Sequence, residues 1–215
     1  MDAKQGSKKI AVLGAGNVGG ALARIWAEAG HNVSIGVPDP ERSQAARSAK
    51  VANLPLLTNQ EASAHADIVV LAVPWPAAEA AVKAAGNLAG KILIDCTNPL
   101  ASDLSELAIG TTTSAAEVIA LQARGAHVVK AFNTIGAGNY GNAMFKGVKA
   151  DGFYCGDDAQ AKATVRDLIA DVGLEPVDVG PLRNARYLEP LAMLWIDLAV
   201  NQKQGMDHAF KLLRR

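Results

Sequence analysis

The sequence predicts an α/β protein with a Rossmann-type, doubly wound and mainly parallel sheet, followed by a small C-terminal helical extension. Three observations predict this class. A short apolar run, a glycine-rich turn and a helical periodicity follow one another near the start, and strand-like and helix-like segments then alternate along the chain. Apolar strands alternating with helices are typical of parallel sheets that are covered on both faces. We expect residues 1–180 to form the dinucleotide-binding domain and residues 181–215 to form a helical segment that completes its cleft.

Residues 10–36 carry the strongest signal. Four uncharged apolar residues (10–13, IAVL) precede the pattern G-x-G-x-x-G at 14–19, apolar residues recur at helical spacing as far as Gly30, and a second apolar segment follows at 33–35. The glycine pattern therefore lies between a strand and a helix inside a βαβ unit, the context in which it indicates dinucleotide binding. The alternative is a glycine-rich turn that binds nothing.

Each glycine of the pattern has a physical role in binding a dinucleotide. Gly14 permits the tight turn, Gly16 lets the backbone approach a pyrophosphate, and Gly19 lets the helix pack closely on the strand. The free N–H groups and the partial positive charge at the start of the helix attract the phosphates.

The residues after the second strand predict which dinucleotide is bound. A carboxylate there would hydrogen-bond the adenosine ribose and repel a 2′-phosphate, but Gly36 holds roughly this place, which favours NADP. Asp39 lies slightly beyond, and Arg42 is the cation best placed to bind a 2′-phosphate. The alternative for Arg42 is a solvated residue at the start of a helix.

The remaining elements follow from hydrophobic periodicity and from Gly and Pro punctuation. Further strands are expected at 54–57, 67–73, 92–95, 127–132, 152–155 and 176–179. Helices are expected at 41–52, 59–66, 77–88, 114–123 and 158–172, with an irregular segment at 100–110.

Polar or proline turns end three of these strands. Val73-Pro74 and Asn98-Pro99 stop two of them, and Asn133-Thr134 ends a third. Ligands of open α/β sheets bind beyond the carboxyl ends of the strands, so the two proline turns are candidates for the nicotinamide side of a cleft. Ordinary turns are the alternative interpretation.

The last 35 residues predict the helical extension. An apolar face that includes Trp195 indicates a helix, and a short final helix is expected over 206–213, beyond Gly205. We expect Trp195 to belong to the core rather than to a ligand platform. Arg186 and Glu189 are three positions apart and predict a surface ion pair. The alternative is that this segment forms a wall of the cleft.

Composition excludes several classes of protein. The chain has 215 residues, and 21 Lys and Arg balance 21 Asp and Glu, so no basic excess favours nucleic acid as a partner. The longest uncharged apolar stretch, 68–78, contains two prolines and is too short to span a bilayer. The two cysteines, Cys96 and Cys155, show no metal-ligand spacing, and we expect buried thiols in a cytoplasmic protein without a metal site.

Six segments of the sequence carry a further, combined signal: LGAGNVGG (13–20), VVLAVPWPA (69–77), ILIDCTNPL (92–100), VVKAFNTIG (128–136), CGDD (155–158) and GPLRNARYLEP (180–190). Together they resemble the deazaflavin (coenzyme F-420)-dependent NADP oxidoreductase family, including its bacterial homologues. The resemblance implies a Rossmann domain with a small helical part, and commonly a homodimer. It also implies NADP on the glycine loop and a deazaflavin ring against the nicotinamide in an apolar cleft.

The resemblance also assigns residues by position. Those expected at the pyrophosphate are Gly14, Ala15, Gly16, Asn17, Val18 and Gly19. Those expected near the nicotinamide are Ala72, Val73, Pro74, Asn98, Pro99, Phe132 and Asn133. Those expected toward the second cofactor, as substrate, are Trp75, Thr134 and Ile135. The family often has Ser-Arg or Val-Arg where this sequence has Val37-Pro38, and Arg42 is expected to compensate for the missing Arg.

The expected reaction is direct hydride transfer between nicotinamide and a deazaflavin or flavin. Because both carriers supply the electronics, the protein has to align two rings and exclude water, and we expect no catalytic acid or base. One alternative is a metalloreductase-like enzyme that uses free flavin and passes electrons to a metal ion. Another is a protein that binds NADP as a sensor and turns nothing over.

Overall fold

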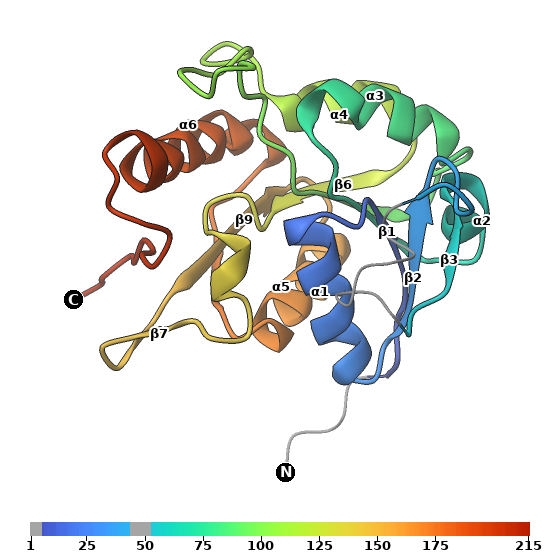
Figure 1. Ribbon diagram of the computed structural model, residues 1–215, viewed down its shortest axis with the longest axis horizontal. Helices are drawn as coiled ribbons and strands as arrows, with labels where there is room; N and C mark the ends of the chain where they lie inside the picture. Colours follow the sequence, from blue (N-terminus) through green and yellow to red (C-terminus); the bar gives the residue numbers. More distant parts are fainter. Residues whose placement is uncertain (1–5, 44–52) are drawn as a thin grey trace.

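The computed structural model describes residues 6–43 and 53–215, and within these ranges it contains an eight-stranded sheet flanked by helices (Figure 1). The strand order is β10-β9-β6-β5-β4-β1-β2-β3. The strands of this sheet are β1 (Lys9–Leu13), β2 (Asn32–Val37), β3 (Leu56–Thr58), β4 (Ile68–Leu71), β5 (Ile92–Asp95), β6 (His127–Ala131), β9 (Asp151–Gly156) and β10 (Glu175–Asp178).

All neighbours in the sheet are parallel except β6 and β9, which run antiparallel. The predicted mainly parallel, Rossmann-type sheet is therefore confirmed. A two-stranded hairpin of β7 (Met144–Phe145) and β8 (Val148–Lys149) lies apart from the main sheet (Figure 1).

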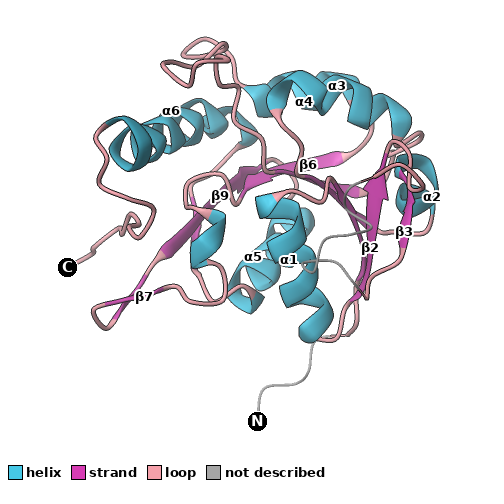
Figure 2. Cartoon of the chain, in the orientation of Figure 1, coloured by secondary structure: helices cyan, strands magenta, loops and turns pink. Residues whose placement is uncertain are grey.

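Helices cover both faces of the sheet (Figure 2). They are α1 (Asn17–Glu28), α2 (Asn59–Ala64), α3 (Trp75–Ala84), α4 (Ala115–Gln122), α5 (Ala159–Asp171) and α6 (Ala185–Ile196). Short helical turns lie at Ala137–Asn139, Leu182–Asn184 and Asp197–Asn201.

Strand β1 is apolar from Ile10 to Leu13 because both faces of the sheet are covered at this strand. Ile10 and Val12 belong to a core cluster formed with α1 and α5, whereas Ala11 and Leu13 belong to a second cluster formed with α3 and α4. Side chains of a strand point alternately to opposite faces, so a strand covered on both faces needs apolar residues at consecutive positions. The two cores enclose β1 inside the sheet, between β4 and β2, and the glycine loop follows β1 directly.

The predicted final helix over 206–213 is wrong. In the structure this segment is irregular, and its backbone groups bond to β9 and to the turn after β6 instead of to one another. The carboxylate of Asp151 accepts from the N–H of Leu212, the N–H of Asp151 donates to the carbonyl of Phe210, and Asn139 Nδ2 donates to the carbonyl of Met206. These external partners replace the i to i−4 bonds of a helix.

Two further predictions concern the segment after β2 and the domain division. Glu41 and Arg42 lie in a turn, and most of the predicted helix over 41–52 lies outside the described residues. A boundary between two domains at residue 180 remains a prediction, although α6 confirms the helical C-terminal part.

Candidate functional site

The glycine loop has the geometry of a dinucleotide site. Gly14 has a φ of +102°, and a Cβ on it would lie 2.6 Å from the carbonyl oxygen of Ala72 at the end of β4. A Cβ on Gly19 would collide with the carbonyl oxygen of Gly14. By contrast, a Cβ on Gly16 would meet no atom within 4 Å. Gly14 and Gly19 therefore allow close packing, while Gly16 leaves open space in front of the helix.

The start of α1 is suited to an anion. Gly16 is its N-cap residue, no side chain among the described residues caps the helix, and its first turn contains no acidic residue. The N–H groups of the first turn have no partner inside the helix, and the helix dipole adds partial positive charge there. A diphosphate therefore fits the space that Gly16 leaves open.

A first cavity of about 420 Å³ extends from this loop over the carboxyl ends of β4 and β5. It is lined by the glycine loop and by the segments that follow the two strands: Gly16, Asn17, Val18, Ala72, Val73, Pro74, Trp75, Pro76, Cys96, Thr97, Asn98, Leu100, Ala101, Ser102 and Leu104.

A second cavity of about 610 Å³ lies between α1, the carboxyl end of β6, and α6 with the tail that follows it. Its lining is mostly apolar and comprises Asn17, Val18, Ala21, Arg24, Cys96, Asn98, Phe132, Asn133, Ile135, Gly136, Ala137, Gly138, Tyr140, Trp195, Ile196 and Met206. Four residues, Asn17, Val18, Cys96 and Asn98, line both cavities, so the two spaces adjoin.

Two side-chain amides, those of Asn98 and Asn133, hydrogen-bond each other where the two cavities adjoin. Asn98 Nδ2 donates to the carbonyl of Asn133 at 3.2 Å, and Asn133 Nδ2 donates to Asn98 Oδ1 at 3.1 Å. Asn133 Nδ2 also donates to the carbonyl of Leu188 on α6, at 3.1 Å. The ends of β5 and β6 and the C-terminal helix are therefore held together at the site.

Phe132 shapes the end of β6. Its backbone adopts a φ of +63°, which is uncommon for a residue with a side chain. The hydroxyl of Tyr140 donates to its carbonyl at 2.7 Å, and its ring packs edge-to-face against Trp26 and Tyr140. These contacts hold the turn that presents Asn133 to the cleft.

A buried ionic network lies beneath the cleft. Lys130 Nζ lies 2.9 Å from Asp95 Oδ2 and 3.0 Å from Glu189 Oε1, and it also donates to the carbonyl of Thr97. Burial lowers the pKa of Lys130, but the charges of Asp95 and Glu189 outweigh this effect and raise the pKa above its usual value. The ammonium thus binds β5 and α6 to β6.

The prediction of a surface pair between Arg186 and Glu189 is wrong. Glu189 is 1% exposed and pairs with Lys130, and its carboxylate also accepts the N–H groups of Ala115 and Ala116 at the start of α4. Arg186 instead binds Glu117 with two hydrogen bonds. Helical spacing alone does not show that two residues three apart face different neighbours. The lysine within the apolar strand VVKA was a signal that a buried carboxylate was needed.

The cysteine thiols are protonated groups in the core. Burial is the largest cause that raises the pKa of Cys96, which lines both cavities, well above its usual range. Burial also raises the pKa of Cys155 to about 12. Both side chains are buried as predicted, and neither supplies a thiolate at neutral pH.

The structure brings most of the predicted site residues to the two cavities and leaves others outside. Gly16, Asn17, Val18, Ala72, Val73, Pro74, Trp75 and Asn98 line the first cavity, and Asn17, Val18, Asn98, Phe132, Asn133 and Ile135 line the second. Gly14, Ala15, Gly19, Pro99 and Thr134 line neither, and Thr134 is buried.

The residues predicted to choose the cofactor lie at the end of β2, outside both cavities. Val37 is buried, while Pro38 is exposed. Arg42 is an exposed side chain whose Nε lies 3.7 Å from the carboxylate of Asp39. This Asp39 carboxylate also accepts the N–H groups of Glu41 and Arg42.

Sequence reasoning missed several lining residues. The sequence predicts Cys96 and Trp195 as core residues, and both are buried, but both also line the cleft. Arg24 and Met206 were not singled out either. Arg24 lies seven positions after Asn17, and this helical spacing was the available signal that both face the same side of α1.

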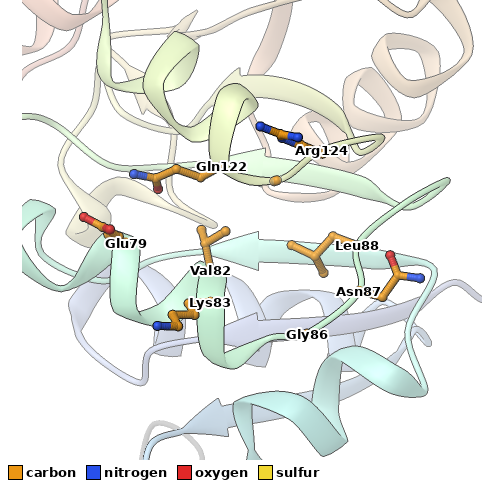
Figure 3. A pocket seen from close by; sticks show the side chains of 9 residues that line it. Glu79, Val82, Lys83, Gly86, Asn87, Leu88, Gln122 and Arg124 are labelled. Atoms are coloured by element: carbon orange, nitrogen blue, oxygen red, sulfur yellow. The ribbon is translucent and has the colours of Figure 1, made fainter.

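A separate cavity of about 410 Å³ lies at the opposite edge of the sheet, between the segments that lead into β5 and β6 (Figure 3). Lys83 and Glu79 of α3 and Arg124 after α4 are among its lining residues. It lies away from the glycine loop, because the carboxyl and amino ends of parallel strands are at opposite edges.

The fold and the cleft define a class: a Rossmann-fold protein with a dinucleotide site and an adjoining second cavity. Residues 9–99 match the family model described as NADP oxidoreductase, coenzyme F-420-dependent. The crystal structure of a candidate F-420-dependent NADP reductase from Arthrobacter sp. FB24 is 33% identical, with a TM-score of 0.89, and the match covers 97% of this chain and 100% of that one. The chain belongs to the coenzyme F-420-dependent NADP oxidoreductase family.

The chain is also similar to two other proteins. The chain is 32% identical over 193 residues to Metalloreductase STEAP3 of Rattus norvegicus, a match that covers 86% of this chain and 37% of that protein. The chain therefore spans little more than a third of this curated relative. A reductive aminase from Aspergillus terreus in complex with NADPH shares the fold at 22% identity and a TM-score of 0.67, over 92% of this chain and 64% of that one. Among the described residues, no helix is both long and apolar enough to cross a bilayer.

Proposed function

We propose that this protein is an NADP(H)-dependent oxidoreductase that transfers a hydride between nicotinamide and a deazaflavin or flavin. The observation that carries the proposal is the pair of adjoining cavities, one reached from the glycine loop and the other between α1, β6 and α6. Two flat rings need such neighbouring spaces to meet face to face. Membership in the family supports the same reaction.

The proposed binding mode follows from the lining residues. The N–H groups at the start of α1 hold the diphosphate in the space in front of Gly16. Val73 and Pro74 form one side of the nicotinamide space in the first cavity, and Asn98 forms the boundary to the second. Phe132 and Ile135 provide an apolar surface for the second ring.

When bound, the nicotinamide supplies the hydride and the second ring accepts it, or the reverse. The protein contributes alignment, because the amides of Asn98 and Asn133 are fixed by each other and by α6. The apolar lining excludes water from the space between the rings. No proton needs to be held by a side chain in this scheme, and Cys96 stays protonated at neutral pH.

NADP is the proposed dinucleotide. Gly36, at the end of β2, places no carboxylate at the adenosine ribose, and Arg42 lies close by as the cation for a 2′-phosphate. Calorimetry with NADPH and NADH on the wild type and on Arg42→Ala tests this preference, and equal affinities of the wild type for both would refute it. From the family relationship we also propose a homodimer located in the cytoplasm.

A metalloreductase-like reaction is the second candidate, favoured by the 32% identity to Metalloreductase STEAP3. In this reaction free flavin would take the hydride and pass electrons to a metal ion. The second cavity would then hold a flavin transiently.

Stopped-flow absorbance measures the oxidation of NADPH with the deazaflavin coenzyme, FMN or FAD as acceptor, each with and without a ferric chelate. Oxidation that depends on a ring acceptor is the expected result. NADPH oxidation by enzyme and flavin that is faster with the ferric chelate than without it, and faster than the same mixture without enzyme, would favour the metalloreductase. Tight NADPH binding without oxidation by any acceptor would overturn the proposal and leave a sensor.

A further inference from the structure

The second cavity contains one charged residue among its described lining residues, namely Arg24. The other lining residues are apolar or neutral polar, and no carboxylate is among them. Arg24 lies on α1 one turn after Ala21 and two turns after Asn17, so these side chains share one face of the helix. The cavity is thus apolar at Phe132 and cationic at one point on α1.

Arg24 is only weakly engaged within the protein. Its Nη1 donates to both carboxylate oxygens of Glu28, at 2.9 and 3.0 Å. The side chains of Arg24 and Glu28 are 48% and 62% exposed, and exposed pairs of this kind contribute little to stability. One guanidinium nitrogen makes both bonds, so the other N–H groups of the planar fork remain able to bind an oxyanion.

We propose that Arg24 binds the phosphate of the side chain carried by the ring compound in the second cavity. The site would therefore select a phosphorylated flavin or deazaflavin over the same ring without phosphate. This inference rests on the proposed function, because it assumes that the second cavity takes a redox ring. The ring lies on the apolar surface near Phe132, and its phosphorylated side chain extends toward the half-exposed guanidinium.

The charges around the second cavity support this orientation of the ring compound, with its phosphate toward Arg24. A phosphate is a strong hydrogen-bond acceptor, and arginine binds phosphates with two parallel N–H bonds. Because no described carboxylate lines the cavity, nothing in the lining repels the anion. Glu28 lies one turn further along α1 and competes with the phosphate for the same guanidinium.

The test compares ring compounds with and without phosphate, in the presence of NADP⁺ so that no hydride is transferred. One probe pair is riboflavin and FMN, and the other is a deazaflavin nucleoside and its phosphorylated coenzyme. Quenching of the fluorescence of each ring compound on binding gives its dissociation constant for the wild type, Arg24→Gln and Glu28→Gln. Arg124→Gln is the matched control, because it removes the same charge at the opposite edge of the sheet (Figure 3).

We expect the phosphorylated member of a pair to bind about tenfold more tightly, which corresponds to one good charge-assisted contact. Arg24→Gln should abolish this preference without changing riboflavin binding, and Arg124→Gln should keep it. Glu28→Gln should strengthen the preference a few-fold, and salt should weaken it. Equal affinities in the wild type, an unchanged preference in Arg24→Gln, or no binding by either ring would overturn the inference.

The two proposals fail in different ways. Phosphate-selective binding without NADPH oxidation would overturn the proposed function and leave the Arg24 site standing. NADPH oxidation that uses riboflavin and FMN equally well would overturn the Arg24 site alone.

Discussion

At the scale of single residues, Gly16 and Gly19 show that one sequence pattern combines two physical requirements. A methyl group on Gly19 would collide with the backbone of the turn, whereas a methyl group on Gly16 would point into open space. Gly19 is therefore needed for the fold itself. Gly16 is needed only for what approaches the helix.

This difference gives a prediction for Gly16→Ala and Gly19→Ala. Gly16→Ala should fold with an unfolding free energy within about 1 kcal/mol of the wild type, since alanine is only a poorer N-cap residue there. Its NADPH affinity should fall about tenfold or more, because the methyl group occupies the space of the diphosphate. Gly19→Ala should lose stability as well. Urea unfolding measures the stability and calorimetry measures the NADPH affinity. Unchanged NADPH binding by Gly16→Ala would contradict a diphosphate in the space in front of Gly16.

Lys130 is the residue on which the buried network depends. In Lys130→Met, Asp95 and Glu189 would remain buried without their cation, and we expect a loss of about 3–5 kcal/mol in unfolding free energy. The double variant Lys130→Met/Glu189→Gln should recover part of this loss, because it removes one uncompensated charge. Urea unfolding tests both variants, and additive losses would show that the network is not coupled.

At the scale of elements, α6 is held to the sheet by contacts from distant segments. Glu189 binds Lys130 of β6 and the start of α4, Leu188 accepts from Asn133, and Arg186 binds Glu117 of α4. The second cavity needs α6 in this position, since Trp195 and Ile196 form one of its walls.

The pair of Glu117 and Arg186 predicts a pH dependence of stability. The hydrogen bonds from Arg186 are the largest cause that lowers the pKa of Glu117 below its usual 4.5. As pH falls below about 4.5, the unfolded chain takes up a proton at Glu117 before the folded chain does, so this pair's contribution to stability is present above that pH and lost below it. Stability should therefore fall less steeply with acid in Glu117→Gln than in the wild type.

Chemical unfolding at a series of pH values measures this slope. Arg186→Gln is the matched control, because it removes the largest cause of the lowered pKa and leaves the carboxylate and its bonds from Ser114 in place. Its slope should be shallower than that of the wild type and approach that of Glu117→Gln. A wild-type slope in both variants would show that the pair of Glu117 and Arg186 does not cause this pH dependence.

The sequence predicted the elements whose pattern is local and missed what depends on remote partners. The unit from β1 to β2 was predicted because its periodicity and its glycines lie within 27 residues (10–36). Residues 206–213 were wrongly predicted as a helix, because their backbone groups bond to Asp151 and Asn139, which are distant in the sequence. The partner of Glu189 was missed for the same reason: Lys130 is distant in the chain and adjacent only after folding.

At the scale of the whole molecule, the parallel strands bring their carboxyl ends to one edge of the sheet. The segments that follow these strands therefore all lie at that edge. The predicted turns after β4, β5 and β6 meet there, and residues of all three line the two cavities. The location of the site at this edge could be predicted from the sequence, because it follows from the parallel topology. The division into two spaces could not, because it depends on where α6 and the tail pack.

The two cavities can be blocked one at a time. Gly138 lies in the turn after β6 and lines only the second cavity, and a Cβ on it would meet no atom within 4 Å. Ser102 is exposed and lines only the first cavity. Tryptophan at either position therefore adds bulk to one cavity without displacing core residues.

Gly138→Trp should raise the KM for the flavin or deazaflavin acceptor about tenfold or more and leave the NADPH dissociation constant unchanged. Ser102→Trp should do the reverse, because its indole occupies the space proposed for the nicotinamide half of the dinucleotide. Steady-state kinetics with either acceptor and calorimetry with NADPH separate the two effects. If Gly138→Trp weakened NADPH binding and spared the acceptor, the rings would have to exchange cavities. If each variant impaired both ligands equally, the two cavities would act as one site, and the assignment of a separate space to each ring would fail.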